Sequence, residues 1–178
     1  TNNRVLVYNL DANGEFLDRI PDRVLGQVNF IANAAAITQA GLSGPSAMAF
    51  DPTKNLLYVL NVNRVTVYDV AAISNGENAV FVLGQATFIA NTAGNTQAGM
   101  NSPRGIALDV TGQRLFVSQN GNNRVTAYDV STIVNGENAT NVLGQFTFTA
   151  TTASSTASGM NAPRGVAYDP AGNRLFVA

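Results

Sequence analysis

Arginine and asparagine are the residue types in this sequence whose regular spacing best indicates a ligand-binding site. Arg104 and Arg164 lie 60 residues apart, and each follows a proline and precedes a glycine. A guanidinium pairs well with carboxylate and phosphate, so this pair predicts a site for an anionic or polar ligand. The residues expected to form that ligand-binding site are Arg104, Arg164, Asn101, Asn161 and Gln97.

Three further arginines, Arg4, Arg64 and Arg124, recur at intervals of 60 residues, each inside the string Asn-Arg-Val. We expect them to hold turns in place by donating hydrogen bonds to backbone carbonyls. Counting charges by strand end places all five of these arginines on one face of the fold, without an acid. The opposite face then receives all 11 acidic residues.

The aspartates most regular in position are Asp51, Asp109 and Asp169, each at the start of a turn. An aspartate in such a place caps its own turn, and a calcium site needs six or more clustered oxygens, so no metal site is expected. The sequence has no His and no Cys, which removes the commonest general base and all thiolate chemistry. We therefore predict no catalytic residues, no cofactor and no enzymatic activity.

Composition limits the partners. The 178 residues carry a formal net charge of −1, without the basic excess that phosphate binding needs, so nucleic acid is an unlikely ligand. No apolar run reaches membrane-spanning length. A chain that is only 12% charged, free of Cys and rich in Asn and Thr is expected to be a secreted or periplasmic bacterial protein.

The elements that must position these residues belong to a threefold repeat. The string Val-Leu-Gly-Gln recurs at 24–27, 82–85 and 142–145. Each copy predicts four short strands rich in β-branched and aromatic residues. The first three strands are expected at 48–50, 106–108 and 166–168, at 57–59, 115–117 and 175–177, and at 5–8, 65–68 and 125–128. Strands that are apolar on both faces fit blades stacked against blades, so the predicted class is an all-β propeller.

The motifs Asn-Arg-Val-x-x-Tyr-Asp, Pro-Arg-Gly-Val-Ala and Asp-Pro-x-Gly-Asn resemble those of bacterial NHL-repeat β-propellers, in the subgroup that carries Val-Leu-Gly-Gln. The resemblance covers the whole chain and implies six blades in a closed ring. It also implies that a zinc-dependent amidating lyase is a relative. The metal ligands of that lyase include His, which this sequence lacks.

The repeat is circularly permuted, because the sequence begins at a third strand and ends after a second strand. The expected units are 1–45 and 164–178, which are complementary parts of a seam blade, and 46–103 and 104–163, which are full blades. Head-to-tail pairing of two chains would close six blades, so a homodimer with composite seam blades is expected. The alternative is that the sequence is an excerpt of a longer chain.

The function predicted from the sequence is a non-enzymatic binding scaffold that uses the arginine-bearing face. Two alternatives stay open at this point. One is a metal-assisted hydrolase or lyase in the central channel. The other is a purely structural or engineered half-propeller, or a filament subunit, in which Arg104 and Arg164 are simply solvated.

Overall fold

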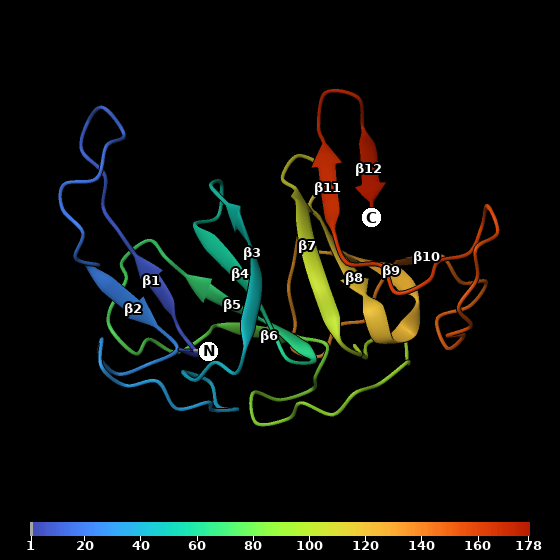
Figure 1. Cartoon of the computed structure of the whole chain (residues 1–178), viewed down its shortest axis with the longest axis horizontal. Coiled ribbons are helices and arrows are strands. Elements are labelled where there is room, and N and C mark those ends of the chain that lie inside the picture. The colour runs from blue at the N-terminus through green and yellow to red at the C-terminus, as the bar shows by residue number, and fades with distance from the viewer. Residues whose placement is uncertain (1) are drawn as a thin grey trace.

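A computed structural model describes residues 2–178 as four antiparallel sheets arranged like a fan (Figure 1). Two of the sheets have four strands each, in sequence order from the innermost strand outwards. The first comprises β3 (Pro45–Asp51), β4 (Leu56–Asn61), β5 (Arg64–Asp69) and β6 (Phe81–Leu83). The second comprises β7 (Pro103–Asp109), β8 (Arg114–Gln119), β9 (Arg124–Asp129) and β10 (Asn141–Leu143).

The remaining two sheets have two strands each. One pairs β1 (Val5–Val7) with β2 (Arg23–Leu25), and the other pairs β11 (Val166–Asp169) with β12 (Arg174–Val177). They lie at the two ends of the fan (Figure 1). A 3₁₀ turn, η1 (Asn120–Asn122), links β8 to β9, and no described helix is long and apolar enough to cross a membrane.

The turn between the first two strands of each blade is built around its aspartate. The Asp51 carboxylate accepts a hydrogen bond from the Thr53 backbone N–H at 2.8 Å, and Asp109 accepts one from the Gly112 N–H at 2.8 Å. Asp109 also forms a 2.6 Å ion pair with Arg114. Burial raises the pKa of Asp109, but the Gly112 and Arg114 hydrogen bonds outweigh it and leave that pKa below its usual value. These contacts confirm that the aspartates are turn residues.

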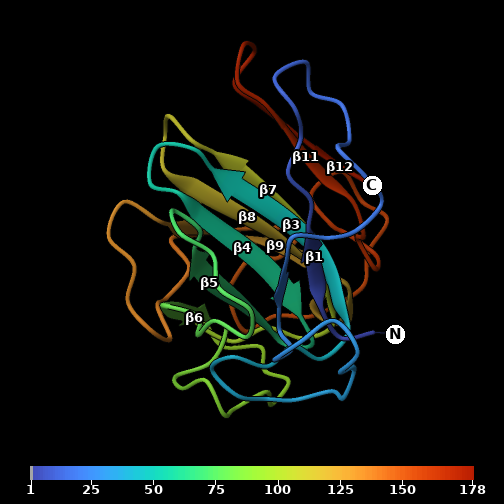
Figure 2. The same ribbon diagram turned by 90° about the vertical axis from the view of Figure 1, so that its left-hand side faces the viewer.

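The core lies between neighbouring sheets rather than inside one of them. Apolar side chains of β4 and β5, such as Leu60 and Val65, pack against Ile106 and Val117 of the next sheet. Smaller clusters join β1–β2 to the first complete sheet and β11–β12 to the second. Figure 2 shows the sheets one behind the other, with β3 and β7 as adjacent inner strands. This stacking explains why the strands are apolar on both faces, and it confirms the predicted propeller blades.

Candidate active site

The asparagine of each Asn-Arg-Val string fixes the start of the next innermost strand. The Asn63 side-chain oxygen accepts a hydrogen bond from the Ser102 N–H at 2.8 Å, and Asn123 holds the Ala162 N–H in the same way at 2.8 Å. Ser102 and Ala162 have φ values of 46° and 51°, a left-handed conformation that costs a non-glycine residue free energy. The asparagine bonds stabilise this bend, which directs the following proline and arginine into the inner strand.

The arginines of the Asn-Arg-Val strings are structural. Arg64 and Arg124 are fully buried, and each donates hydrogen bonds to backbone carbonyls of the long connections between blades. Burial lowers the pKa of Arg124, an effect that Tyr128 opposes. The predicted bonding to backbone carbonyls is therefore present, but the carbonyls belong to the connections between blades and not to a turn. The burial of Arg64 and Arg124 also corrects the predicted charge of the basic face, because these two guanidinium groups are not at the surface.

The glutamine of Val-Leu-Gly-Gln completes the same network. Gln85 donates through its amide nitrogen to the carbonyls of Asn63 and Thr92, both at 2.9 Å. Gln145 repeats this arrangement with Asn123 and Thr152, both at 2.8 Å. The conspicuous motif residues of the repeat are therefore bonded to the backbone, and ligand chemistry must come from other positions.

Arg104 is such a position. It is the second residue of β7 and is exposed, and none of residues 2–178 accepts a hydrogen bond or forms an ion pair with its guanidinium. It borders a hollow of about 240 Å³ between the starts of β3 and β7. The lining residues are Ser43, Gly44, Ser46, Val62, Asn63, Ser102, Pro103 and Arg104.

The hollow combines one unpaired cation with several hydroxyl and amide groups. Its lining includes no carboxylate. The nearest acid on the same strand, Asp109, is five residues from Arg104, or about 17 Å at the usual rise per residue. Without a nearby carboxylate to neutralise it, the Arg104 guanidinium is free to bind an anion or to stabilise a developing oxyanion.

The structure places the other residues of the predicted site in different surroundings. Arg164 and Asn161 are exposed near the start of β11, and Arg164 has the same repeat position as Arg104. Asn101 lines a neighbouring hollow of about 260 Å³. Gln97 donates to the Ala139 carbonyl at 2.7 Å and therefore holds a loop of the next blade.

Sequence reasoning did not place two residues that line the hollow, Asn63 and Ser102. Both contribute to the bend before the proline, which the sequence shows only as a repeated Asn and a repeated X-Pro step. The sequence could not show that Asn63 and Ser102 are hydrogen-bonded to each other, because the two positions are 39 residues apart.

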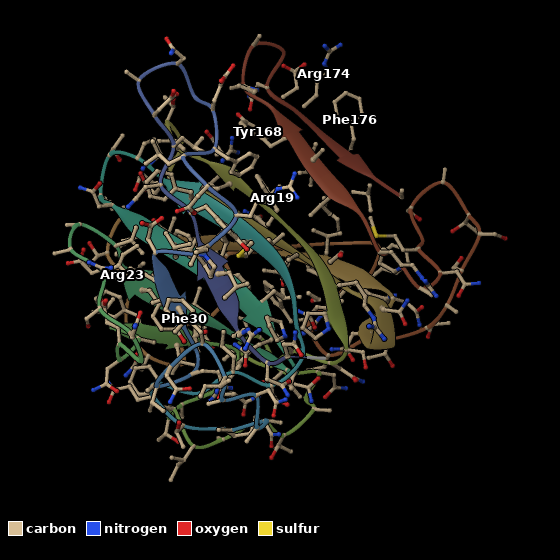
Figure 3. All side chains as sticks on the ribbon, turned by 60° about the vertical axis from the view of Figure 1, so that its left-hand side comes forward. Arg19, Arg23, Phe30, Tyr168, Arg174 and Phe176 are labelled. Carbon is tan, nitrogen blue, oxygen red and sulfur yellow. The ribbon has the colours of Figure 1, made fainter. Side chains whose placement is uncertain are left out.

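A larger hollow of about 420 Å³ is lined by Tyr8, Phe16, Asp18 and Arg19, and it lies beside the β1–β2 connection. Figure 3 shows Arg19 on this connection. Tyr68 and Tyr128, which have the repeat position of Tyr8, are fully buried by a preceding blade. We therefore assign this hollow to the uncovered side of an incomplete sheet rather than to a site.

Residues 2–178 match the family model described as Lactonase, 7-bladed beta-propeller. The chain belongs to this lactonase family. Among curated proteins, none matches it. The match supports the predicted β-propeller but does not confirm the NHL-repeat subgroup, and a six-bladed homodimer and a secreted location remain predictions.

Membership of the lactonase family contradicts the prediction that the protein has no enzymatic activity, because the family is one of enzymes that hydrolyse lactones. The prediction gave too much weight to the missing His and Cys. Those residues supply general bases and covalent nucleophiles, but water can attack an ester carbonyl without either when the developing charge is stabilised. A binding scaffold is accordingly replaced by a hydrolytic protein as the better interpretation.

Proposed function

We propose that this protein hydrolyses a lactone at the inner face of the propeller, with Arg104 as the cationic group of the site. The observation that carries the proposal is the lactonase-family match over residues 2–178. The hollow beside Arg104 supports this location. There an exposed arginine that has no ion pair within residues 2–178 lies next to hydroxyl and amide groups.

A lactone is a cyclic ester, and its hydrolysis requires stabilisation of negative charge. Water attacks the carbonyl carbon, and the carbonyl oxygen becomes an oxyanion in the tetrahedral intermediate. The bond from this carbon to the ring oxygen then breaks, the ring oxygen takes a proton, and the product is a hydroxy acid whose carboxyl group ionises. A guanidinium near the carbonyl stabilises the oxyanion more than the neutral ester, and such differential binding lowers the barrier.

The remaining polar groups of the hollow are suited to positioning. Ser46 and Ser102 present hydroxyls that accept and donate hydrogen bonds, as a hydroxylated lactone would require. No His or Cys is present, and no carboxylate lies in the lining to activate these serines, so we assign them to binding rather than to nucleophilic attack. Arg164, at the same repeat position in the next sheet, is proposed to bind a second polar group of the substrate.

The test is acid release in a pH-stat with a panel of five- and six-membered lactones, neutral and carboxylated. We expect at least one lactone to be hydrolysed faster than in buffer. Arg104→Ala should lower kcat/KM by about 100-fold, the usual effect of losing an oxyanion donor, and Arg104→Lys should restore part of it. The matched control is Arg19→Ala, which removes an exposed arginine from the larger hollow.

Two results would overturn the proposal. The first is that no lactone of the panel reacts faster with the protein than without it. The second is hydrolysis that Arg104→Ala leaves unchanged, which would put the site elsewhere. A larger loss in Arg19→Ala than in Arg104→Ala would identify the hollow beside Tyr8 as the reacting site.

A further inference from the structure

A second hollow near the start of β7 is lined by uncharged polar groups. It holds about 260 Å³ and lies where η1 meets the long connections before and after the second complete sheet. Its lining includes no charged side chain. Asn101 in the lining is followed directly by Ser102, so this hollow adjoins the one that contains Arg104. We call it the amide hollow, and its polar lining comprises Gly94, Asn95, Asn101, Gly121, Asn122 and Thr151.

The amide hollow depends on an insertion in the second complete sheet. The link from β4 to β5 is residues 62–63, whereas the link from β8 to β9 is residues 120–123 and is therefore two residues longer. The longer link forms the coiled turn η1, which leads into β9 (Figure 1). Insertions within a single repeat lie in loops on one face of a repeat protein, and that face is often the one that binds ligands.

The inserted turn is held firmly by the connection opposite it. Asn122 is 1% exposed, and its amide nitrogen donates to the Gly94 carbonyl and to Gln119 Oε1, both at 2.8 Å. A methyl group on Gly121 would lie 2.6 Å from the Asn101 side chain, so the glycine allows the Asn101 amide to lie against the turn. These contacts fix the shape of the hollow in advance, which lowers the entropy cost of binding a ligand there.

The repeat itself does not require amides at this place. In the first complete sheet and the connection before it, the corresponding positions are Ala36, Ile37 and Val62. None of these has a polar side chain, yet that sheet has the same four strands in the same order. The amides around η1 are therefore additional to what the blade needs in order to fold.

Several groups of the amide hollow retain hydrogen-bonding capacity. The Asn101 amide nitrogen lies 3.4 Å from both the Gly121 carbonyl and Asn122 Oδ1, which is longer than the usual distance of about 2.9–3.0 Å. Asn95 donates to the Thr149 carbonyl at 2.9 Å, but no group within residues 2–178 donates to its Oδ1. The Thr151 hydroxyl likewise forms no hydrogen bond within these residues. The hollow thus offers a donor, an acceptor and a hydroxyl that can act as either.

We propose that the amide hollow binds one sugar unit of a neutral saccharide chain. Sugar hydroxyls donate and accept hydrogen bonds at neighbouring atoms, which matches closely spaced amides and a hydroxyl. A charged ligand would find no opposite charge in the lining, and an apolar ligand would bury these polar groups without partners. The hollow is smaller than the about 300–1,000 Å³ of pockets for drug-sized ligands, so the rest of the chain extends into solvent. This binding is separate from lactone hydrolysis.

Isothermal titration calorimetry with maltotriose, cellotriose and xylotriose tests the proposal. We expect at least one of these trisaccharides to bind with a millimolar Kd. Thr151→Val keeps the side-chain shape and removes only the hydroxyl, whereas Asn101→Ala removes the amide beside η1. Each substitution should weaken binding by about 10-fold, the usual effect of losing one hydrogen bond.

Two matched controls accompany these variants. Thr152→Val makes the same change at the next residue, which is exposed and outside the lining. Asn161→Ala removes the asparagine that has the repeat position of Asn101 in the following sheet, and it also lies outside the lining. Both control variants should bind the trisaccharide as tightly as the unsubstituted protein.

Shortening the inserted turn gives an independent test. Replacing Asn120–Asn122 with a single valine reproduces the link of the first complete sheet, and it should abolish saccharide binding while the β-sheet circular dichroism spectrum is kept. If this variant fails to fold, the point substitutions still decide the question.

Four results would overturn the proposal. They are no binding of any of the three trisaccharides, equal effects of Thr151→Val and Thr152→Val, full binding by the shortened variant, and a loss in Arg104→Ala as large as that in Asn101→Ala. The last result would place the saccharide in the adjoining hollow. Because none of the trisaccharides contains a lactone and the readout is the heat of binding, these outcomes are independent of whether the protein hydrolyses lactones.

Discussion

Replacing the buried arginine of a complete blade is the sharpest test of how the repeat is held together. Arg124 is fully buried and donates to Gln119 at 3.2 Å and to the backbone carbonyls of Asn95 at 3.1 Å and Gly99 at 2.8 Å. It also donates to the Phe148 carbonyl and, at 3.0 Å, to Thr96. Arg124→Met keeps most of the side-chain volume but removes the charge and every donor.

The expected cost follows from what is left behind. Hydrogen bonds to charged groups contribute about 1.5–3 kcal/mol each, but burial of the guanidinium offsets much of that gain. The substitution also leaves several carbonyls without a donor, at about 1–3 kcal/mol for each that water does not reach. The loss of these bonds, with several neutral carbonyls left without a donor, leads us to expect a loss of about 3–5 kcal/mol in the free energy of unfolding.

The sequence contains its own control. Arg4 has the same repeat position in the incomplete β1–β2 sheet, but it is only partly buried, and it donates to the carbonyls of Phe30 at 2.5 Å and Ala32 at 3.4 Å. Arg4→Met should therefore cost about 1 kcal/mol. Urea unfolding followed by circular dichroism measures both, since the protein has no Trp. Equal losses of unfolding free energy for the two variants would refute the argument that the stabilising effect of this arginine depends on its burial and its bonds to backbone carbonyls.

Two further predictions concern other parts of the repeat. Gly84 and Gly14 have similar φ values of +86° and +80°, but a methyl group on Gly84 would come within 2.8 Å of the Met100 sulfur and one on Gly14 would contact nothing within 4 Å. Gly84→Ala should thus cost about 2–3 kcal/mol and Gly14→Ala about 1 kcal/mol in urea unfolding, and equal costs would mean that the Met100 contact is unimportant. Because the pKa of Asp109 is lowered in the folded state, its stabilising effect is present above the unfolded pKa of about 3.9 and is lost as pH falls through the folded pKa. The stability difference between the unsubstituted protein and Asp109→Asn should therefore be largest near neutral pH and shrink in acid, and a constant difference from pH 7 to pH 2 would contradict this.

The blade was predictable from sequence because its signals are local and occur three times. Alternating β-branched and aromatic residues specify strands, and the Asp-containing turns specify where β3 joins β4 and where β7 joins β8. Three copies in phase make an accidental pattern implausible. The number of blades in the ring could not be predicted in this way, because it depends on small angles between sheets, and no single residue type determines those angles.

The site was less predictable because identical residue types have opposite environments. Arg104 and Arg124 are both arginines at the start of a strand, yet one is exposed and the other fully buried. What separates them is the long connection from one blade to the next, whose carbonyls surround Arg124 but not Arg104. The bond from Gln97 to the Ala139 carbonyl could not be predicted for the same reason, since the two residues are 42 positions apart in sequence.

The repeat divides its polar residues between building the blade and forming the hollow. Asn63, Arg64 and Gln85 are bonded to the backbone, so a substitution at any of them changes the scaffold. The residue after the proline is Arg104 in one blade and Ser46 in another, and the Arg104 side chain forms no hydrogen bond within residues 2–178. This position can therefore change the chemistry of the hollow without changing the blade. The hollow has Ser46 on its β3 side and Arg104 on its β7 side, so under the proposed function a lactone would bind with its carbonyl oxygen towards Arg104 and its ring substituents towards Ser46.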